Sequence, residues 1–174
     1  MLATPSTPVA HDAARVALRA ITAKVSLLRA ARRRHRAALK IDVLDWTWKV
    51  HLNANMASGS GGGVGKASVS DLEFTHQLDR ASPNLARYCF TGQHIPTAVL
   101  TVRKAGGTPH EILRITLEDV AITFFEPFVD ANGAIECVRL SFARKKMEYI
   151  LQTPQGGNGG TITALFDVKK NTSR

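Results

Sequence analysis

The sequence predicts a mainly β fold: an antiparallel, two-sheet β-barrel with one short α-helix at about residues 82–91, preceded by a basic, helical N-terminal arm. Three observations support this fold class. From residue 41 onward, apolar and polar residues alternate with a period of two in several segments, which is typical of strands with one buried face. Turn-forming residues separate these segments. A single segment of this region carries the start and end signals of a helix.

Composition narrows the class of protein further. The chain has 174 residues, the size of one ordinary domain, and 44% of them are hydrophobic, which excludes a wholly disordered chain. No apolar stretch approaches the roughly 20 residues that a membrane-spanning helix needs. Cys89 and Cys137 stand in apolar surroundings and are expected to be free, buried thiols. The sequence opens without a secretory signal pattern.

Charge divides the chain at residue 40. The net charge is +9, but residues 1–40 hold nine basic residues against one acidic residue, whereas residues 41–174 hold fourteen against thirteen. We therefore distinguish a basic, Ala- and Arg-rich arm from a nearly neutral β domain. In the arm, apolar residues at three- and four-residue steps predict an amphipathic helix over residues 12–36. Its final cluster, Arg32–Arg36, is either a phosphate-binding patch or a solvated helix end.

Alternation predicts the strands of the β domain. The phase changes after Val43, which predicts a bulge near Val43–Leu44. A Gly- and Ser-rich loop at residues 53–66 follows the first strand. Phase changes within 111–125 and 138–151 are expected where long strands bend around a closing barrel. The apolar residues expected to share strand faces are Leu44, Trp46, Trp48, Val50 and Leu52; Leu72, Phe74 and Leu78; Leu113, Ile115 and Leu117; Val120, Ile122 and Phe124, in the other phase; Val138, Leu140 and Phe142; Met147, Tyr149 and Leu151; and Ile162, Ala164, Phe166 and Val168.

Residues 82–91 carry the signals of the helix. Ser82 is the expected N-cap, Pro83 suits the first turn, and Gly92 suits a left-handed C-terminal cap. In the first predicted strand of the β domain, Trp46 and Trp48 lie two residues apart and therefore on one face. We interpret them as core aromatics rather than as a platform for stacking bases.

No motif predicts catalysis. Residues 60–67 resemble a phosphate-binding loop, but Ser60 and Ala67 replace the glycine and the hydroxyl residue that the loop requires, and a strand is predicted where the loop needs a helix. The six histidines lack metal-ligand spacing, and His76 is the one expected to be buried. No nucleophile elbow or Cys–His arrangement is present. The sequence therefore predicts a binding and assembly protein, not an enzyme, with no metal and no cofactor.

Several short segments stand in a specific order between residues 41 and 170. They are IDVLDWTW at 41–48, GGGVGK at 61–66, DLEFT at 71–75, DRASPNL at 79–85, GQHI at 92–95, LTVRKAGG at 100–107, ITLEDV at 115–120, LSFAR at 140–144 and EY at 148–149. Their order and spacing together resemble the hemolysin-coregulated protein (Hcp) family, the inner-tube proteins of bacterial type VI secretion. The resemblance covers about three-quarters of the chain.

The resemblance implies a structural subunit of stacked hexameric rings that are expelled from the cell and carry effectors in their lumen. The implied partners are other copies of the chain, a contractile sheath, a valine-glycine-repeat spike and effector proteins, with neither nucleic acid nor a membrane among them. It implies assembly in the bacterial cytoplasm, then secretion without a cleaved signal peptide. Ring or stacking contacts are expected at Ser58, Gly61, Gly62, Gly63, Lys66, Arg103, Lys104, Gly106, Gly107, Arg144 and Lys145.

The arm departs from the family pattern, in which a short strand and an acidic, glycine-containing loop come first. Residues 24–28 can serve as a degenerate first strand. Alternatively, residues 1–40 are a wrong start or an out-of-frame translation, and the missing strand would leave an open sheet edge. The alternative function is a nucleic-acid-binding β-barrel module that uses the basic arm.

Overall fold

The structure, a computed structural model, describes residues 21–28, 38–54, 64–104, 110–131, 133–153 and 157–173. These residues form eleven strands and one helix, α2 (Ser82–Thr91). The strands are β1 (Ile21–Leu28), β2 (Ala38–Val43), β3 (Asp45–Thr47), β4 (Val50–Ala54), β5 (Val64–Val69), β6 (Leu72–Gln77), β7 (Ile95–Lys104), β8 (His110–Asp130), β9 (Gly133–Gln152), β10 (Asn158–Asp167) and β11 (Thr172–Ser173).

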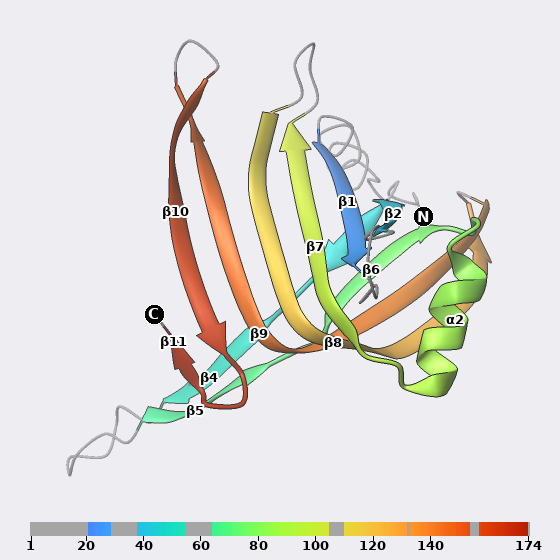
Figure 1. The fold of residues 1–174 in the computed structure, drawn as a ribbon, viewed down its shortest axis with the longest axis horizontal. Helices are drawn as coiled ribbons and strands as arrows, with labels where there is room; N and C mark the ends of the chain where they lie inside the picture. Colours follow the sequence, from blue (N-terminus) through green and yellow to red (C-terminus); the bar gives the residue numbers. More distant parts are fainter. Residues whose placement is uncertain are drawn as a thin grey trace, which may run out of the picture.

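All but two of the strands belong to a single antiparallel sheet. Its order is β11, β10, β9, β8, β7, β1 and β2, and β6 joins it along β9 with β3 beyond it. The strands β4 and β5 pair as a separate hairpin. The large sheet is strongly curled into a half-barrel, with α2 at one end and the β4–β5 hairpin at the other (Figure 1). The predicted class, mainly antiparallel β with one short helix, is confirmed.

The curl comes from a sharp bend in the long strands β8 and β9 (Figure 1). It falls at Asp119, whose φ of 56° is left-handed and uncommon for a residue with a side chain. Lys169 Nζ and His94 Nδ1 lie 3.0 and 2.9 Å from the two carboxylate oxygens of Asp119. Their hydrogen bonds hold the pKa of Asp119 below its ordinary value. The predicted phase change between Leu117 and Val120 is confirmed, since both side chains are buried on either side of the bend.

One hydrophobic core connects the strands of the curl with α2. Burying each large aliphatic or aromatic side chain contributes about 1.5–3 kcal/mol, so this core is the main source of the stability of the subunit. Its largest fully buried apolar members include Leu27, Ile41, Leu72, Phe74, Leu85, Leu100, Ile115, Leu117 and Leu140.

The helix predicted for residues 12–36 is wrong for residues 21–28, which form β1 between β2 and β7. Val25 pairs with Ile41 on one side and with Leu100 on the other, and its side chain is fully buried. In the sheet, the backbone N–H and C=O groups of this segment are hydrogen-bonded to β2 and β7, and its apolar side chains are buried. Together these interactions outweigh the local preference for a helix. The alternative of a degenerate first strand at residues 24–28 is confirmed. The remaining parts of the predicted helix, 12–20 and 29–36, lie outside the described residues.

Both compositional parts of the chain contribute to this sheet. β1 lies within residues 1–40, and β2 begins at Ala38 and continues into the β domain. Lys24 Nζ of β1 lies 2.8 Å from the carboxylate of Asp42 in β2, so an arm lysine pairs with an acid of the β domain. The division of the chain at residue 40 therefore describes the distribution of charge. It is not a boundary of the fold, because residues 21–28 of the arm belong to the sheet.

The first predicted strand of the β domain is broken into three. The break at Leu44 between β2 and β3 agrees with the predicted bulge. Trp46 and Trp48 are half-buried and pack against the core, as predicted, but Leu44, Val50 and Leu52 are exposed. The burial expected of these three residues is wrong. Leu44 lies in the break between β2 and β3. Val50 and Leu52 lie in β4, which leaves the large sheet and pairs with β5, so the large sheet does not cover them.

Smaller differences have local causes. A bulge between Ile122 and Phe124 turns Phe124 outward, where its ring lies under the guanidinium of Arg139, and Phe125 packs on the core instead. β6 ends at Gln77, which leaves Leu78 exposed.

The expected helix is confirmed over its whole length, with Gly92 as a left-handed cap at φ 60°. Its N-cap is Ala81 and not Ser82. The Ser82 hydroxyl instead accepts a hydrogen bond from the backbone N–H of Asp79 at 3.0 Å.

Candidate assembly site

An apolar face of the half-barrel is left uncovered beyond the bend. Tyr149 and Ile162 stand opposite one another in β9 and β10, and they are 51% and 61% exposed. Met147 pairs with Ile115, a fully buried residue of β8, so this exposed face continues the core face of the sheet. We call it the open face; its exposed apolar members are Met147, Tyr149, Leu151 and Ile162.

The β4–β5 hairpin lies along the edge of the open face. Val50 and Leu52 of β4 are about half exposed and stand opposite Val69 and Ala67 of β5. Between this hairpin and strands β9 and β10 is a cavity of about 200 Å³. We call it the Trp48 cavity; it is lined by Trp48, Val50, Val69, Lys145, Met147, Ala164, Leu165 and Phe166.

Lys145 is the one charged side chain of the Trp48 cavity, and it is 95% buried. It stands opposite Leu117 in β8 and Phe166 in β10, and its Nζ lies 2.6 Å from the centroid of the Trp48 ring. Burial in these apolar surroundings lowers the pKa of Lys145 to about 7. Neither its Nζ nor the indole Nε1 of Trp48 has a hydrogen-bond partner among the described residues. Both nitrogens are buried, and the lysine nitrogen lies on the face of the Trp48 ring as a cation–π contact, so the surface that the cavity leaves open is apolar.

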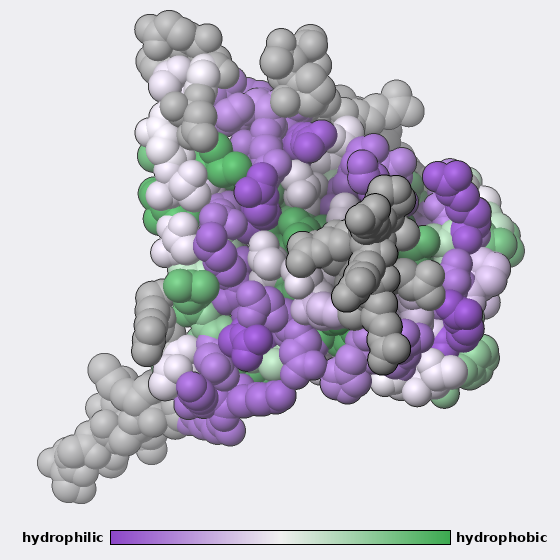
Figure 2. Space-filling model, in the orientation of Figure 1, coloured by the Kyte–Doolittle hydropathy of each residue, from purple (hydrophilic) through white to green (hydrophobic). Residues whose placement is uncertain are grey.

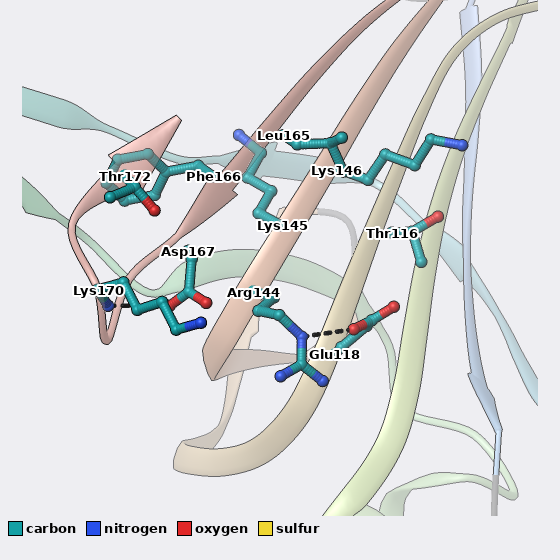
Figure 3. Close-up of a pocket in the computed structure, with 10 residues that line it drawn as sticks. All are labelled: Thr116, Glu118, Arg144, Lys145, Lys146, Leu165, Phe166, Asp167, Lys170 and Thr172. Carbon is teal, nitrogen blue, oxygen red and sulfur yellow. Dashed lines mark hydrogen bonds and ion pairs between the residues drawn. The ribbon is translucent and has the colours of Figure 1, made fainter. Parts of the chain in front are cut away.

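A second, more polar cavity of about 330 Å³ is lined by residues of β8, β9 and β10 (Figure 3), and it shares Lys145, Leu165 and Phe166 with the lining of the Trp48 cavity. Lys145 and Lys146 are successive strand residues and their side chains leave β9 in different directions (Figure 3). Arg144 Nε donates to Glu118 Oε2 at 2.7 Å, and this bond raises the pKa of Arg144. Because its arginine is already paired, this cavity is a mixed-charge surface and not a ready anion site.

Exposed apolar residues also occur at the opposite end of the half-barrel. Leu78, Phe128 and Val129 are exposed where β8 turns into β9, and Phe90 is exposed on α2. Figure 2 shows a mainly hydrophilic face between two edges with hydrophobic residues, one beside β10 and one beside α2. Glu126 is exposed two residues before Phe128, on the same face of β8. We call Leu78, Glu126, Phe128 and Val129 the β8–β9 tip.

The structure places the predicted contact residues in different surroundings. Lys66 is exposed at β5, Arg103 and Lys104 are exposed at the end of β7, and Arg144 is in the ion pair with Glu118. Lys145 differs from all of them because its side chain is buried against the β4–β5 hairpin. The predicted residues Ser58, Gly61, Gly62, Gly63, Gly106 and Gly107 lie outside the described residues.

Sequence reasoning did not single out the open face or the β8–β9 tip. Met147, Tyr149, Leu151 and Ile162 follow the alternation of a buried strand, so the pattern assigned them to the core. The sequence did contain a signal for the second surface, because Glu126 stands among apolar residues in the segment Phe-Glu-Pro-Phe-Val at 125–129. Alternation alone does not reveal whether a matching surface is present in the same chain.

A buried ion pair joins β6 and β9 near α2. His76 Nε2 lies 2.6 Å from Glu136 Oε1, and both side chains are almost fully buried, which confirms the expected burial of His76. Burial raises the pKa of Glu136, while Ser82 and His76 act in the opposite direction. The pair joins two strands of the sheet, and Ser82 in the first turn of α2 also bonds the carboxylate of Glu136. It is a structural feature of the subunit.

Among the described residues, no group of three or more His, Cys, Asp or Glu side chains is arranged to hold a metal ion. Cys89 and Cys137 are free thiols, and burial raises the pKa of Cys137. The described helix is neither long nor apolar enough to cross a membrane.

Comparison with known proteins gives a consistent result. The family described as "Type VI secretion system effector, Hcp" matches residues 32–149. The "Protein hcp1" of Pseudomonas aeruginosa is 35% identical over 142 residues, which are 77% of this chain and 85% of that protein. The crystal structure of Hcp1 from Salmonella typhimurium is 36% identical and has a TM-score of 0.67, covering 89% of this chain and 99% of the other. A type VI secretion system effector from Yersinia pestis is 32% identical, with a TM-score of 0.61 and coverage of 85% and 99%.

Proposed function

Because the chain belongs to the Hcp family of the type VI secretion system, we propose that it is a subunit of the secretion tube, which assembles into stacked hexameric rings. The family is structural and not enzymatic. In this proposal the rings are assembled in the bacterial cytoplasm and expelled without a cleaved signal peptide. Their partners are other copies of the chain, the contractile sheath, the valine-glycine-repeat spike and effectors in the lumen.

The open face is the observation that carries this proposal. Four large apolar side chains there continue the core face of the sheet but are left in water. A contiguous exposed apolar face of this kind is typical of a surface that another protein covers. Self-association covers it with no need for a second gene product, and homo-oligomers with closed symmetry are the common outcome.

Ring formation can be tested directly with the full chain. Size-exclusion chromatography with light scattering is expected to give a mass near six times 18.9 kDa, and negative-stain images are expected to show rings. A Leu151→Asp variant is expected to remain folded and to lose the rings, because it places a charge on the open face. Gln152→Asp on the adjacent strand position, which points to the other face, is the matched control. A strictly monomeric wild-type chain at high concentration contradicts the proposal.

The basic arm supports a second candidate, a nucleic-acid-binding module. Its test must spare β1, so Arg32, Arg33, Arg34 and Arg36 are replaced by glutamine instead of deleting residues 1–40. Salt-dependent DNA binding that disappears with these replacements supports the second candidate. Unchanged ring assembly in the same variant, with no DNA binding by the full chain, supports the tube subunit.

A further inference from the structure

We propose that His76, Glu136 and Ser82 form a proton-dependent clamp between the sheet and the start of α2. In this clamp the buried His76–Glu136 pair keeps one proton at a pH where a free histidine and a free glutamate hold none. Above about pH 6.5, folding of the subunit therefore takes up a proton, and the clamp weakens when that proton is lost. The clamp belongs to the single subunit, so it is independent of the proposed ring.

The clamp is formed where β6, β9 and α2 meet. His76 stands opposite Glu136 in the β6–β9 ladder, and its Nε2 lies 2.6 Å from Glu136 Oε1. The two side chains are 1% and 0% exposed, so bulk water solvates neither of them. Ser82, in the first turn of α2, bonds to the same carboxylate. Its Oγ also accepts a hydrogen bond from the backbone N–H of Asp79 at 3.0 Å, which leaves the hydroxyl proton free to be donated to Glu136.

The pair has one basic member and no second cation. Burial raises the pKa of Glu136, and the other groups that act on this carboxyl are Ser82, His76 and Asp79. Asp79 is itself an acid and raises the pKa of Glu136 further. A buried carboxylate without a compensating charge is strongly destabilising. The pair is therefore neutral, either as imidazolium with carboxylate or as imidazole with carboxylic acid, and both forms hold one proton more than imidazole with carboxylate.

The other charged groups of the elements around the pair lie elsewhere. The side chain of Cys137 leaves β9 on the face opposite to Glu136. The charged groups on that face act on Cys137, and they are Glu73, Arg139 and Glu126. In β8, the residue opposite Glu136 is Pro127, which does not titrate. Arg80, before α2, and Arg87, the one charged residue of α2, are exposed. None of these groups takes the place of the proton in the pair.

The sign of the pH dependence follows from the number of protons bound. In the unfolded chain, a histidine and a glutamate together bind one proton between about pH 4.3 and pH 6.5, and none above about pH 6.5. The folded pair binds one proton in both ranges. Its contribution to stability is therefore constant below about pH 6.5 and falls as the pH rises further. The fall is about tenfold per pH unit in the folding equilibrium constant, until the folded pair loses its proton.

Urea unfolding of Glu136→Gln tests this proton in the full chain, at concentrations below those at which rings assemble. In the variant, a neutral imidazole faces an amide, and the folded state keeps no proton there. The readout is the unfolding equilibrium constant of the variant divided by that of the wild type, because titrations common to both proteins, such as that of Lys145, cancel. This ratio is expected to fall about tenfold per pH unit from about pH 5.5 to pH 7.5. A ratio that does not change with pH overturns the clamp.

Glu73→Gln is the matched control. It removes an acid of the same strand, β6, from the exposed ion pair with Arg139, and its ratio to the wild type is expected to stay constant over the same pH range. An equal fall in the control would assign the pH dependence to the loss of any carboxylate, which also overturns the clamp.

NMR tests the wild-type protein even if Glu136→Gln fails to fold. At pH 7.5, the ¹⁵N shifts of His76 and the ¹³C shift of the Glu136 carboxyl are expected to show an imidazolium or a carboxylic acid. A neutral imidazole beside an ionised carboxylate overturns the clamp. Neither measurement depends on whether rings form, so failure of the clamp leaves the proposed function standing.

Discussion

The two halves of β9 have the same apolar alternation and different surroundings. Before the bend, Val138 and Leu140 face the core between β6 and β8 and are fully buried. Beyond the bend, Tyr149 and Leu151 continue between β8 and β10, and about half of each side chain is in water. The first half of β9 therefore stabilises the subunit through buried apolar surface, whereas in the proposed ring the second half would contribute its burial free energy to a contact with another copy.

The covered half should be most sensitive at its buried ion pair. His76→Leu removes the partner of Glu136 and leaves a buried carboxylate without compensation, which is expected to cost about 3–5 kcal/mol in the free energy of unfolding. Glu136→Gln, which removes the charge together with the need for a cation, is expected to cost less. Urea unfolding of the isolated subunit measures both. Equal losses in the two variants would contradict this account.

One substitution made in both halves of β9 compares them directly. Leu140→Ala is expected to cost about 2–5 kcal/mol because Leu140 is fully buried, whereas Leu151→Ala is expected to cost below about 1 kcal/mol because Leu151 is 41% exposed. The order is expected to reverse for ring assembly measured under conditions where both variants are folded. A large loss of subunit stability in Leu151→Ala would show that the open face is covered within the subunit.

The bend between the two halves can be weakened by itself. Asp119→Ala is expected to lower the melting temperature because the bonds to His94 and Lys169 are lost while the β-carbon stays in the left-handed region. Asp119→Gly removes the strain and the bonds together, and is expected to cost less. Thermal unfolding distinguishes the two variants. If the Asp119→Ala variant is more stable than Asp119→Gly, the bend does not depend on the left-handed backbone of Asp119.

Much of the fold could be predicted because it depends on short-range signals. The alternation around Ile115 and Val120 marks a strand with a phase change, and Pro83 with Gly92 marks the ends of α2. The segment around Val25 was misassigned because its spacing suits a helix and a strand alike, and the edge offered by β7 and β2 decides between them. The candidate site was only partly predicted: Lys145 was expected at a contact, but its burial under Trp48 depends on the packing of the β4–β5 hairpin.

The sequence by itself determined the strand pattern, the single helix of the β domain, the uneven charge and the family to which the chain belongs. These follow from local propensity and from the order of short segments. Only the tertiary structure decided which apolar faces are covered, because coverage depends on strands far apart in the chain, such as β6 and β10 on either side of β9. Tyr149 and Leu140 lie in the same apolar alternation, and the strands packed against each of them leave Leu140 buried and Tyr149 exposed.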